Sequence, residues 1–381
     1  MKYKLGELCD VVSGGTPSRA ITEFWEGGTI PWIKIGNIKG KYVGEVDEYI
    51  TQAGLEGSSA KILSAGTILF TIFATLGEVG ILTIKACTNQ AIAGITIKNQ
   101  SEALTDYLYY FLKSKKSHVT ALGRGVAQNN INLSILRNFE VPIPALSTQK
   151  QIVDVLDKAE KIIEARQQQL QKLDELVKAR FVELFGDGNH PHIALIDLII
   201  EGAGLSYGIV QPGDDGTGDM GVLRPVDMVD GKISTASIKY IDRSIGDGFK
   251  KTELYGDELL ITVRGTTGIT ALTDIRFNGM NVTRGIAVVR YDRNKINPVY
   301  LNAYLNTDES QRYIQEHTRG ATLQQINLSD LRVQQIMVPP LALQEQMAAF
   351  IEQTDKSKVA VQKALDEAQL LFDILMQKYF G

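Results

Sequence analysis

The sequence contains an internal repeat with a very long period. GRGVAQNNINLS begins at Gly123 and TRGATLQQINLS begins at Thr318, so the repeat distance is 318 − 123 = 195 residues. The register continues without a gap from Arg124/Arg319 to Gly186/Gly381, and further matched positions are Arg137/Arg332, Pro144/Pro339, Leu146/Leu341, Gln149/Gln344, Gln151/Gln346, Lys161/Lys356, Leu170/Leu365, Leu176/Leu371 and Phe185/Phe380. Solenoid repeats have periods of about 20–50 residues. The repeat therefore indicates two copies of a unit made of a domain and a following element.

The following element is predicted to be a long helix. In the first copy, Thr148 to Gln151 forms a Thr-x-x-Gln capping box, and no Gly or Pro occurs after it until the final glycine of the copy. Apolar residues recur at heptad spacing, interrupted at Arg166 in the first copy and at Thr354 and Lys358 in the second. The expected seam consists of Ile152, Leu156, Ile163, Leu170, Leu173, Val177, Leu184, Met347, Ile351, Val361, Leu365, Phe372 and Leu375. Each helix of about 38 residues would be roughly 57 Å long.

Neither of these helices can bury its apolar stripe alone. We expect the two helices to pack on each other as an antiparallel pair. The alternative is two separate surface helices, each lying on its own domain. The two matched seams favour the pair.

The region before each helix has a different composition, rich in Gly, Thr, Ile and Val. Runs such as GTILFTI, IAGITI, DELLITV and GIAVVRY predict strands with tight turns. Helical segments are expected late in each region, at 105–118 and 298–317, and GDGNHPH at 186–192 marks the boundary between the halves. The predicted fold class is α+β, with two similar mixed α/β domains separated by two long antiparallel helices that form a coiled coil. The predicted segments are 1–146 (first domain), 147–186 (central helix), 187–341 (second domain) and 342–381 (C-terminal helix).

The two domains share a framework but differ in their loops. Matched framework positions are Thr71/Thr262, Gly77/Gly268, Asn89/Asn281 and the segments 34–38/224–228. By contrast, SGGTPSRAITEFWEGG at 13–28 is opposite the unrelated EGAGLSYGIVQPGDDG. Such a chain suits two similar modules that recognise two different things.

The composition and the missing motifs argue against an enzyme. The 381 residues are 44% hydrophobic and 22% charged, with two Cys, four His and a net charge of −4. There is no phosphate loop, no G-x-G-x-x-G, no metal-binding motif, no G-x-S-x-G elbow and no amino-methyltransferase tetrapeptide. The N-terminus has no apolar signal core, and the longest uncharged stretch, 62–77, is too short to span a membrane. We therefore expect a soluble, cytoplasmic binding protein without catalytic residues, metal or cofactor of its own.

The remaining polar residues suit contacts with DNA, because Arg and Lys pair with guanine edges and Asn and Gln with adenine edges. In the first domain the candidates are Thr16, Ser18, Arg19, Lys34, Asn37, Thr71, Thr75, Asn89, Gln90, Arg124, Gln128, Asn129 and Asn130. In the second domain they are Tyr207, Gln211, Arg224, Arg264, Thr266, Thr267, Arg284, Arg319, Gln324 and Gln325. For each candidate, ordinary surface polarity is an equal alternative. We interpret Trp32 as a core residue, and the repeated Ile-Asn-Leu-Ser as a structural turn before the strand that leads to the long helix.

Over its whole length the chain resembles the specificity subunits of type I restriction-modification systems. The resemblance rests on SGGTPSR…GTIPWIKIGNI, on GTILFTI…LGEVGI with NQAIAGI, and on INLSxLR…VPIPxLxxQxxIV, which occurs in related form in each half. It implies two target recognition domains, each reading one half of a split DNA site, and a helix pair that sets their spacing. The implied partners are double-stranded DNA, two methyltransferase subunits that carry S-adenosylmethionine and methylate adenine, and restriction/translocase subunits. The GGTPS signature is missing from the second half at 202–221, so no residue role is carried over to that loop.

Two other functions are consistent with the sequence. One is a coiled-coil adaptor whose globular domains bind protein, which would show no sequence preference on DNA. The other is a stand-alone nuclease or methylase with an unrecognised site, which would modify DNA without a partner.

Overall fold

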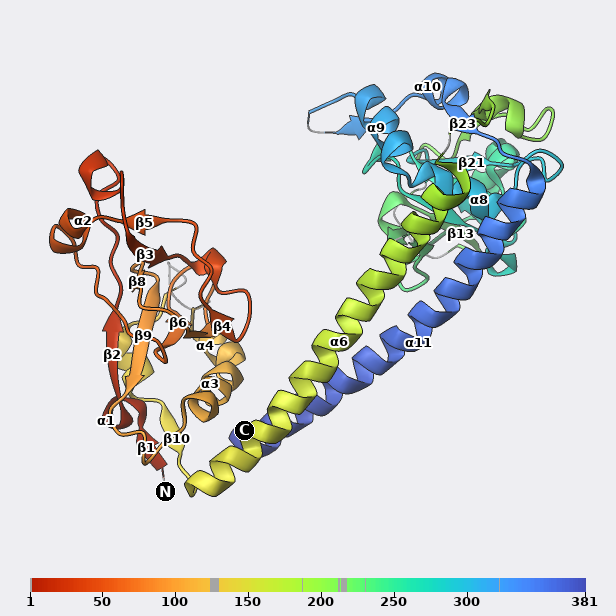
Figure 1. Cartoon of the computed structure of the whole chain (residues 1–381). Coiled ribbons are helices and arrows are strands. Elements are labelled where there is room, and N and C mark those ends of the chain that lie inside the picture. The colour runs from red at the N-terminus through yellow and green to blue at the C-terminus, as the bar shows by residue number, and fades with distance from the viewer. Residues whose placement is uncertain are drawn as a thin grey trace. The chain divides into compact units, whose positions relative to one another are not determined.

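The computed structural model describes residues 2–123, 130–186, 188–211, 213, 218–229, 231–321 and 323–381 (Figure 1). The chain divides into two compact units, Met1–Gln168 with Gln362–Gly381, and Gln169–Val361. Both units contain a mixed fold and part of each long helix. The four segment boundaries expected from the sequence are not the boundaries of these units, and they remain predictions.

The first unit is built on a five-stranded sheet in the order β2-β9-β6-β7-β4, in which only the β4–β7 pair is parallel. A three-stranded sheet, β5-β3-β8, and a β1–β10 ribbon complete it. The strands are β1 (Lys2–Lys4), β2 (Cys9–Ser13), β3 (Ile30–Ile33), β4 (Tyr42–Val43), β5 (Tyr49–Ile50), β6 (Ile68–Thr71), β7 (Val79–Leu82), β8 (Cys87–Thr88), β9 (Ile92–Ile97) and β10 (Glu140–Pro142). The helices before the long one are α1 (Leu5–Leu8), η1 (Thr22–Phe24), η2 (Ile35–Asn37), α2 (Gln52–Glu56), α3 (Thr105–Ser114), α4 (Lys116–Gly123) and α5 (Leu133–Arg137).

The central strand β6 is apolar at every position but its last because the sheet is covered on both faces. Successive side chains of a strand point to opposite faces. Ile68 and Phe70 pack with α3 residues such as Tyr107, whereas Leu69 packs with Ile33 of β3 on the other face. The sheet therefore lies between a helical layer and the smaller sheet.

The second unit repeats this plan with sheets β12-β21-β17-β19 and β16-β13-β20, and the ribbons β11–β23, β14–β15 and β18–β22. Its strands are β11 (His192–Ala194), β12 (Ser206–Tyr207), β13 (Met220–Leu223), β14 (Met228–Val229), β15 (Lys232–Ile233), β16 (Lys239–Ile241), β17 (Leu259–Thr262), β18 (Arg264–Gly265), β19 (Thr270–Leu272), β20 (Asn281–Val282), β21 (Ile286–Val289), β22 (Gln324–Gln325) and β23 (Gln335–Met337). Its shorter helices are η3 (Leu195–Leu198), η4 (Pro225–Asp227), α7 (Arg243–Gly246), η5 (Asp247–Thr252), η6 (Ile275–Phe277), α8 (Pro298–Leu305), α9 (Asp308–His317) and α10 (Leu328–Val333).

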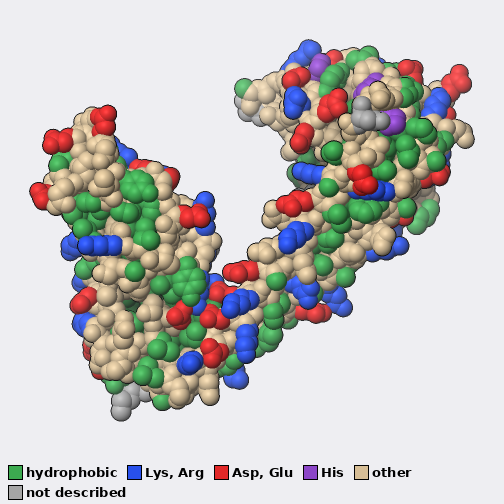
Figure 2. All heavy atoms as spheres, viewed as in Figure 1, with side chains coloured by type: hydrophobic (Ala, Val, Ile, Leu, Met, Phe, Trp, Pro, Cys, Tyr) green, Lys and Arg blue, Asp and Glu red, His purple; other side chains and the backbone are tan. Residues whose placement is uncertain are grey.

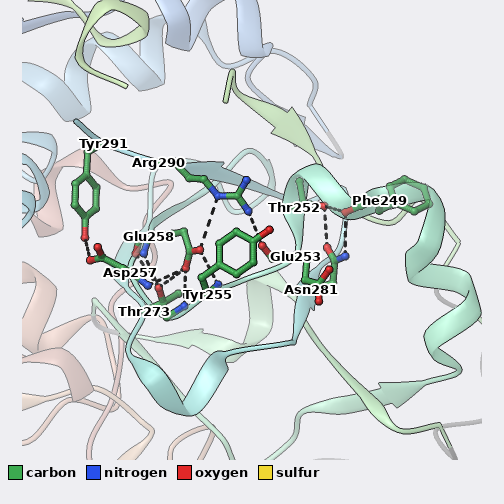
Figure 3. Close-up of polar contacts among 11 residues, drawn as sticks. Phe249, Thr252, Glu253, Tyr255, Asp257, Glu258, Thr273, Asn281, Arg290 and Tyr291 are labelled. Carbon is green, nitrogen blue, oxygen red and sulfur yellow. Dashed lines mark hydrogen bonds and ion pairs between the residues drawn. The ribbon is translucent and has the colours of Figure 1, made fainter. Parts of the chain in front are cut away.

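A buried carboxylate fixes the turn that leads into β17 (Figure 3). Glu258 is fully buried and accepts hydrogen bonds from the backbone N–H groups of Tyr255 (2.7 Å), Gly256 (3.1 Å) and Asp257 (3.1 Å). The Thr273 hydroxyl donates a further hydrogen bond to it (2.8 Å). A buried charge is tolerated only when it is paired and hydrogen-bonded, and these donors meet that condition.

The two long helices are α6 (Leu146–Phe185) and α11 (Leu341–Phe380), whose bounds differ by the 195-residue repeat distance. In the first unit, Leu156 near the start of α6 belongs to the same core as Phe372 and Phe380 near the end of α11. In the second unit, Asp174 of α6 forms an ion pair with Lys358 of α11 (2.7 Å). The start of one helix thus lies beside the end of the other, so the pair is antiparallel, as expected (Figure 1).

All thirteen predicted seam residues are buried or half-buried, and none is exposed. The predicted interruptions are accommodated locally. Thr354 is buried and its hydroxyl donates to the Phe350 carbonyl (2.9 Å), while Lys358 is neutralised by its ion pair with Asp174. Figure 2 shows positive and negative side chains interspersed over the exposed surface of the helices.

Some local predictions need correction. The first long helix begins at Leu146, two residues before the capping box at Thr148. The segment 105–118 is broken into α3 and α4, and the segment 298–317 into α8 and α9. The repeated Ile-Asn-Leu-Ser starts a short helix rather than a simple turn, since Asn132 caps α5 through the Ile135 N–H (2.9 Å).

A repeated glutamine ties each long helix to its own domain. Gln149 and Gln344 are both fully buried. The Gln149 amide oxygen accepts from the Leu104 N–H (2.9 Å), and the Gln344 amide oxygen accepts from the Asn297 N–H (2.8 Å). Their amide nitrogens donate to the carbonyls of Pro144 (2.9 Å) and Pro339 (2.7 Å), respectively. Each glutamine therefore fixes the start of a long helix against the loop before α3 or α8.

Replacing Gln344 by Leu should destabilise the second unit, because it leaves buried backbone donors and acceptors without partners. We expect a loss of about 2 kcal/mol, which corresponds to a melting temperature lower by about 5 °C. The matched control is Gln346→Leu, which changes an exposed residue of the same helix. Equal melting temperatures for the two variants, measured by differential scanning calorimetry, would contradict this role.

Candidate nucleic-acid interface

Loops of the first unit meet at one end of its five-stranded sheet. The loop after β2 donates the Gly14 N–H to the Ile92 carbonyl (3.1 Å), and the loop after β6 donates the Ile72 N–H to the Ala91 carbonyl (2.8 Å). A Cβ on Gly14 would lie 2.3 Å from the Asn89 carbonyl oxygen, so this approach requires glycine. The candidates brought to this end are Thr16, Thr71, Thr75, Asn89, Gln90 and Asn130.

Two acidic residues that sequence reasoning did not single out, Asp47 and Glu48, hold three of the candidates. Glu48 forms ion pairs with Arg19 and with Lys34 (2.7 Å). Asp47 accepts from the Lys34 ammonium (2.8 Å) and from the Asn37 amide (2.9 Å). A DNA phosphate at Arg19 or Lys34 would compete with these carboxylates.

The contacts also fix the charge of this group. The hydrogen bond from Lys34, followed by that from Asn37, lowers the pKa of Asp47 to about 2. The hydrogen bond to Asp47, followed by that to Glu48, raises the pKa of Lys34. The hydrogen bond from Lys34 lowers the pKa of Glu48. These pKa shifts keep Lys34, Asp47 and Glu48 charged at neutral pH. The formal charges of the group formed by Arg19, Lys34, Asp47 and Glu48 therefore cancel.

Gly15, Ser18 and Arg19 of the 13–19 loop contact two tryptophans. Trp32 is buried, as expected, and its indole N–H donates to the Gly15 carbonyl (2.9 Å). The Trp25 indole N–H donates to the Ser18 carbonyl (3.1 Å), and the Arg19 guanidinium lies 3.6 Å from the Trp25 ring centroid. Trp32 is therefore not a stacking platform for bases.

Thr71 was a candidate for DNA contact, and its position in the structure argues against that role. It is fully buried, and its hydroxyl accepts from the Glu78 N–H (2.8 Å) and donates to the Thr75 carbonyl. In the second unit the hydroxyl of its counterpart Thr262 accepts from the Ile269 N–H (2.9 Å). The hydroxyl closes the following loop and is not available to DNA.

Thr267 and Arg224 also have partners within the protein. Thr267 is buried and its hydroxyl is 2.9 Å from that of Thr318. Arg224 forms a forked pair with the fully buried Asp227, through Nε (3.1 Å) and Nη2 (3.0 Å), and this hydrogen bonding raises the pKa of Arg224. Arg224 thus stabilises the η4 turn, in the position that Lys34 occupies beside η2.

Arg264 and Arg284 have a different environment. Arg264 lies in β18, paired with β22, and the Arg284 backbone N–H donates to the Ile209 carbonyl (2.9 Å) at the same end of the sheet. Arg264 is half-buried and Arg284 is exposed. Over the ranges that the structure describes, neither guanidinium has a hydrogen-bond or ion-pair partner. Both guanidinium groups are therefore available to an external anion or a guanine edge.

Other candidates of the second unit lie around this pair. Arg319 pairs with Gln325 through the backbone, and its side chain is 3.8 Å from Asp330. The Tyr207 hydroxyl accepts from the Leu328 N–H (3.4 Å). Gln211, Thr266 and Gln324 are exposed.

One matched pair from the sequence is shifted by two residues. The parallel pairing of Trp32 with Cys87 corresponds to that of Val222 with Asn281. Asn281 is therefore the counterpart of Cys87 and not of Asn89. It is buried, and it bonds to Thr252 and to the Phe249 carbonyl (Figure 3). By this register, Gln90 and Arg284 occupy equivalent positions.

Arg124, Gln128 and Asn129 lie outside the described residues.

Sequence reasoning also missed Phe73, an apolar side chain that is 44% exposed beside the polar candidates. Among the described residues, no group of three or more His, Cys, Asp or Glu could hold a metal ion, and no helix is long and apolar enough to cross a membrane.

Comparisons with known proteins agree on one family. The profile described as "Type I restriction modification DNA specificity domain" matches residues 1–175 and 219–368. The MjaIX specificity subunit of Methanocaldococcus jannaschii is 23% identical over 98% of this chain and 91% of its own length. The EcoBI specificity subunit of Escherichia coli is 21% identical over 77% of this chain and 69% of its own.

Solved structures show the same fold. The S subunit of a type I restriction-modification system from M. genitalium aligns with a TM-score of 0.58 at 15% identity, covering 100% of this chain and 96% of that one. A second chain, from a structure on complex assembly and conformational transition of the type I system, aligns with a TM-score of 0.56 at 17% identity, covering 100% of this chain and 97% of that one.

The chain has two related domains on one antiparallel helix pair, and the loops differ between the domains. This architecture defines a recognition protein with two binding domains. This chain belongs to the type I restriction-modification DNA specificity family. It is a DNA specificity subunit with two target recognition domains, and the subunit is non-catalytic.

Proposed function

We propose that each target recognition domain reads one half of a bipartite, asymmetric DNA site with the loops at the end of its main sheet. The supporting observation is a shared frame that carries different side chains. Thr71 and Thr262 close equivalent loops, yet the exposed tips of these loops differ in chemistry. Two domains with one scaffold and two sets of tips suit two different half-sites.

The helix pair is proposed to set the distance between the half-sites. Each helix has 40 residues, so its length is about 60 Å at 1.5 Å per residue. This is roughly the length of 18 base pairs at 3.4 Å each. The seam residues are buried along both helices, which favours a stiff spacer over a flexible linker.

Exposed apolar side chains on the helices are proposed to dock two methyltransferase subunits. On α11 in the first unit, Leu370, Leu371 and Ile374 are each more than half exposed; on α6 in the second unit, so is Val182. Contiguous exposed apolar patches rimmed by polar residues mark interaction sites, and Leu370, Leu371 and Ile374 are neighbours on the surface of one helix. S-adenosylmethionine would then be bound by the partner, together with the methylation chemistry, and restriction/translocase subunits would join for cleavage.

The acidic net charge fits a subunit that holds DNA only within a complex. A net charge of −4 gives little non-specific attraction to DNA phosphates. The group formed by Arg19, Lys34, Asp47 and Glu48, whose charges cancel, likewise gives little attraction to DNA phosphates. Positive charge from the partners would then supply much of the phosphate contact.

Replacing Arg264 or Arg284 by Ala should damage recognition of one half-site only. A lost arginine–guanine contact lowers discrimination by about 5- to 150-fold. The test is to assemble each variant with its methyltransferase subunits and to map methylated adenines across a genome. The expected result is a motif relaxed at one position of one half, with the other half and the spacer unchanged.

The matched control is Arg276→Ala, an exposed arginine whose partner is Asp274. It should leave the motif unchanged. If Arg264→Ala and Arg284→Ala both give the unaltered motif in a stable complex, these residues have no role in recognition. A complex with no sequence preference would favour the coiled-coil adaptor.

A further inference from the structure

The loop after the third strand of each main sheet has the same construction in both units. Its first residue is Thr71 or Thr262, and its carbonyl accepts from Gly77 N–H (3.0 Å) or Gly268 N–H (2.9 Å). Both glycines have left-handed backbones, with φ of 81° and 88°. The loops therefore superpose residue by residue, at a constant offset of 191 positions.

By this offset, Phe73 of the first unit and Arg264 of the second unit occupy equivalent positions. Phe73 forms a β-bridge with Asn130, and Arg264 pairs with Gln325. Asn130 and Gln325 are themselves related by the 195-residue repeat distance. Two independent registers thus agree that the two side chains occupy the same position.

Both loops are held firmly, so their tips are preorganised. Ile72 and Leu76 of the first loop are buried, and so are Val263 and Thr267 of the second. The positions between them face outward. In the second unit the Gln311 amide also donates to the Gly268 carbonyl (3.0 Å).

The residue after Phe73 carries backbone strain. Ala74 has φ of 61°, and it is the one non-glycine residue in the described ranges with a positive φ; its counterpart Gly265 has φ of 88°. Strained positions persist only where the surrounding structure enforces them, and they cluster at functional sites. The first unit thus keeps a strained turn beneath a phenyl ring that is 44% exposed to solvent.

We propose that this pair of positions determines one base in each half-site: Phe73 contacts the C5-methyl group of a thymine, and Arg264 donates to the O6 and N7 atoms of a guanine. The inference rests on the proposed reading of DNA by these loops. A phenyl ring offers apolar contact but no hydrogen bond, and in the major groove only the thymine methyl rewards such contact. The unpartnered guanidinium of Arg264 suits the two acceptors of a guanine edge.

The test uses the complex assembled with its methyltransferase subunits and duplexes that carry the motif mapped for the wild type. Uracil replaces each thymine of the first half-site in turn, which removes only the methyl group. Wild type should methylate one of these duplexes about 4-fold more slowly, since one buried methyl group is lost. Phe73→Ala should be slower on the thymine duplex and should no longer distinguish uracil at that position.

The matched control is Ile62→Ala, which removes an apolar side chain of the same unit that is 41% exposed. It should retain the wild-type preference for thymine over uracil. For the second half-site, 7-deazaguanine replaces each guanine and removes N7. Wild type should methylate the duplex more slowly when 7-deazaguanine stands at one of these positions. Arg264→Ala should methylate the guanine and 7-deazaguanine duplexes at equal rates at that position.

The inference fails if Phe73→Ala still distinguishes thymine from uracil as wild type does, or if wild type is indifferent to every uracil. It also fails if Arg264→Ala retains full sensitivity to 7-deazaguanine. A wild-type complex that yields no bipartite motif at all would instead refute the proposed function. The mapping step therefore separates the two failures.

Discussion

Deleting seven residues from each long helix is expected to abolish methylation of the native site while leaving both half-site preferences intact. The deletion removes 164–170 from α6 and 362–368 from α11, in the register given by the Asp174–Lys358 ion pair. Seven residues preserve the heptad phase, so the seam can still close. The helix pair becomes shorter by about 10.5 Å, equivalent to about three base pairs.

The size of the effect follows from losing one half-site. If only one domain can engage the native site at a time, the base contacts of the other are lost. Two such contacts contribute on the order of 3 kcal/mol, or more than 100-fold in affinity. Methylation rates on native-site duplexes and on duplexes with shorter spacers would measure this.

The control for folding is assembly with the methyltransferase subunits, followed by circular dichroism to confirm the helical content. Lys172→Ala, an exposed change on α6, should behave as wild type. A correctly assembled deletion variant that methylates the native site at the wild-type rate would show that the helices do not set the spacing.

Replacing Glu258 by Leu is expected to cause the largest loss of stability, about 3–5 kcal/mol. The substitution leaves three backbone N–H groups and the Thr273 hydroxyl without their acceptor. It also leaves the largely buried Arg290, whose Nε lies 3.9 Å from Glu258, without a counter-charge. Breaking a buried ionic network by removing one partner costs this much because the other charge stays buried.

Hydrogen exchange of β17 and β19, combined with thermal unfolding, would measure the loss where it arises. Arg293→Ala is the matched control, because its ion pair with Asp257 is exposed and should contribute less than about 1 kcal/mol. If β17 and β19 exchange their amide hydrogens at wild-type rates in the Glu258→Leu protein, the Glu258 carboxylate does not stabilise this part of the fold.

The sequence predicted the framework well because duplication doubles a weak signal. A heptad pattern interrupted once in the first copy and twice in the second is ambiguous in either copy alone, but two copies in one register identify both long helices and their pairing. Comparison of the two halves also matched the turns at 34–38 and 224–228. In these turns the Lys34 N–H donates to the Asn37 side chain (3.0 Å) and the Arg224 N–H donates to the Asp227 side chain (2.8 Å).

The candidate site was harder to predict because polarity alone does not reveal a partner. Arg19 is paired with Glu48, which lies 29 residues away in the sequence, and Thr71 is polar but fully buried. Phe73 was overlooked for the opposite reason. An apolar residue directly after a buried strand is expected to be part of the hydrophobic core. Only the closed loop shows that its ring points outward.

The most direct test of bipartite recognition is to express the wild-type chain with its methyltransferase subunits in a host free of adenine methylation, and to map every modified adenine. We expect one asymmetric motif of two specified halves, separated by an unspecified gap of constant length. A single uninterrupted motif, or methylation without any motif, would contradict it.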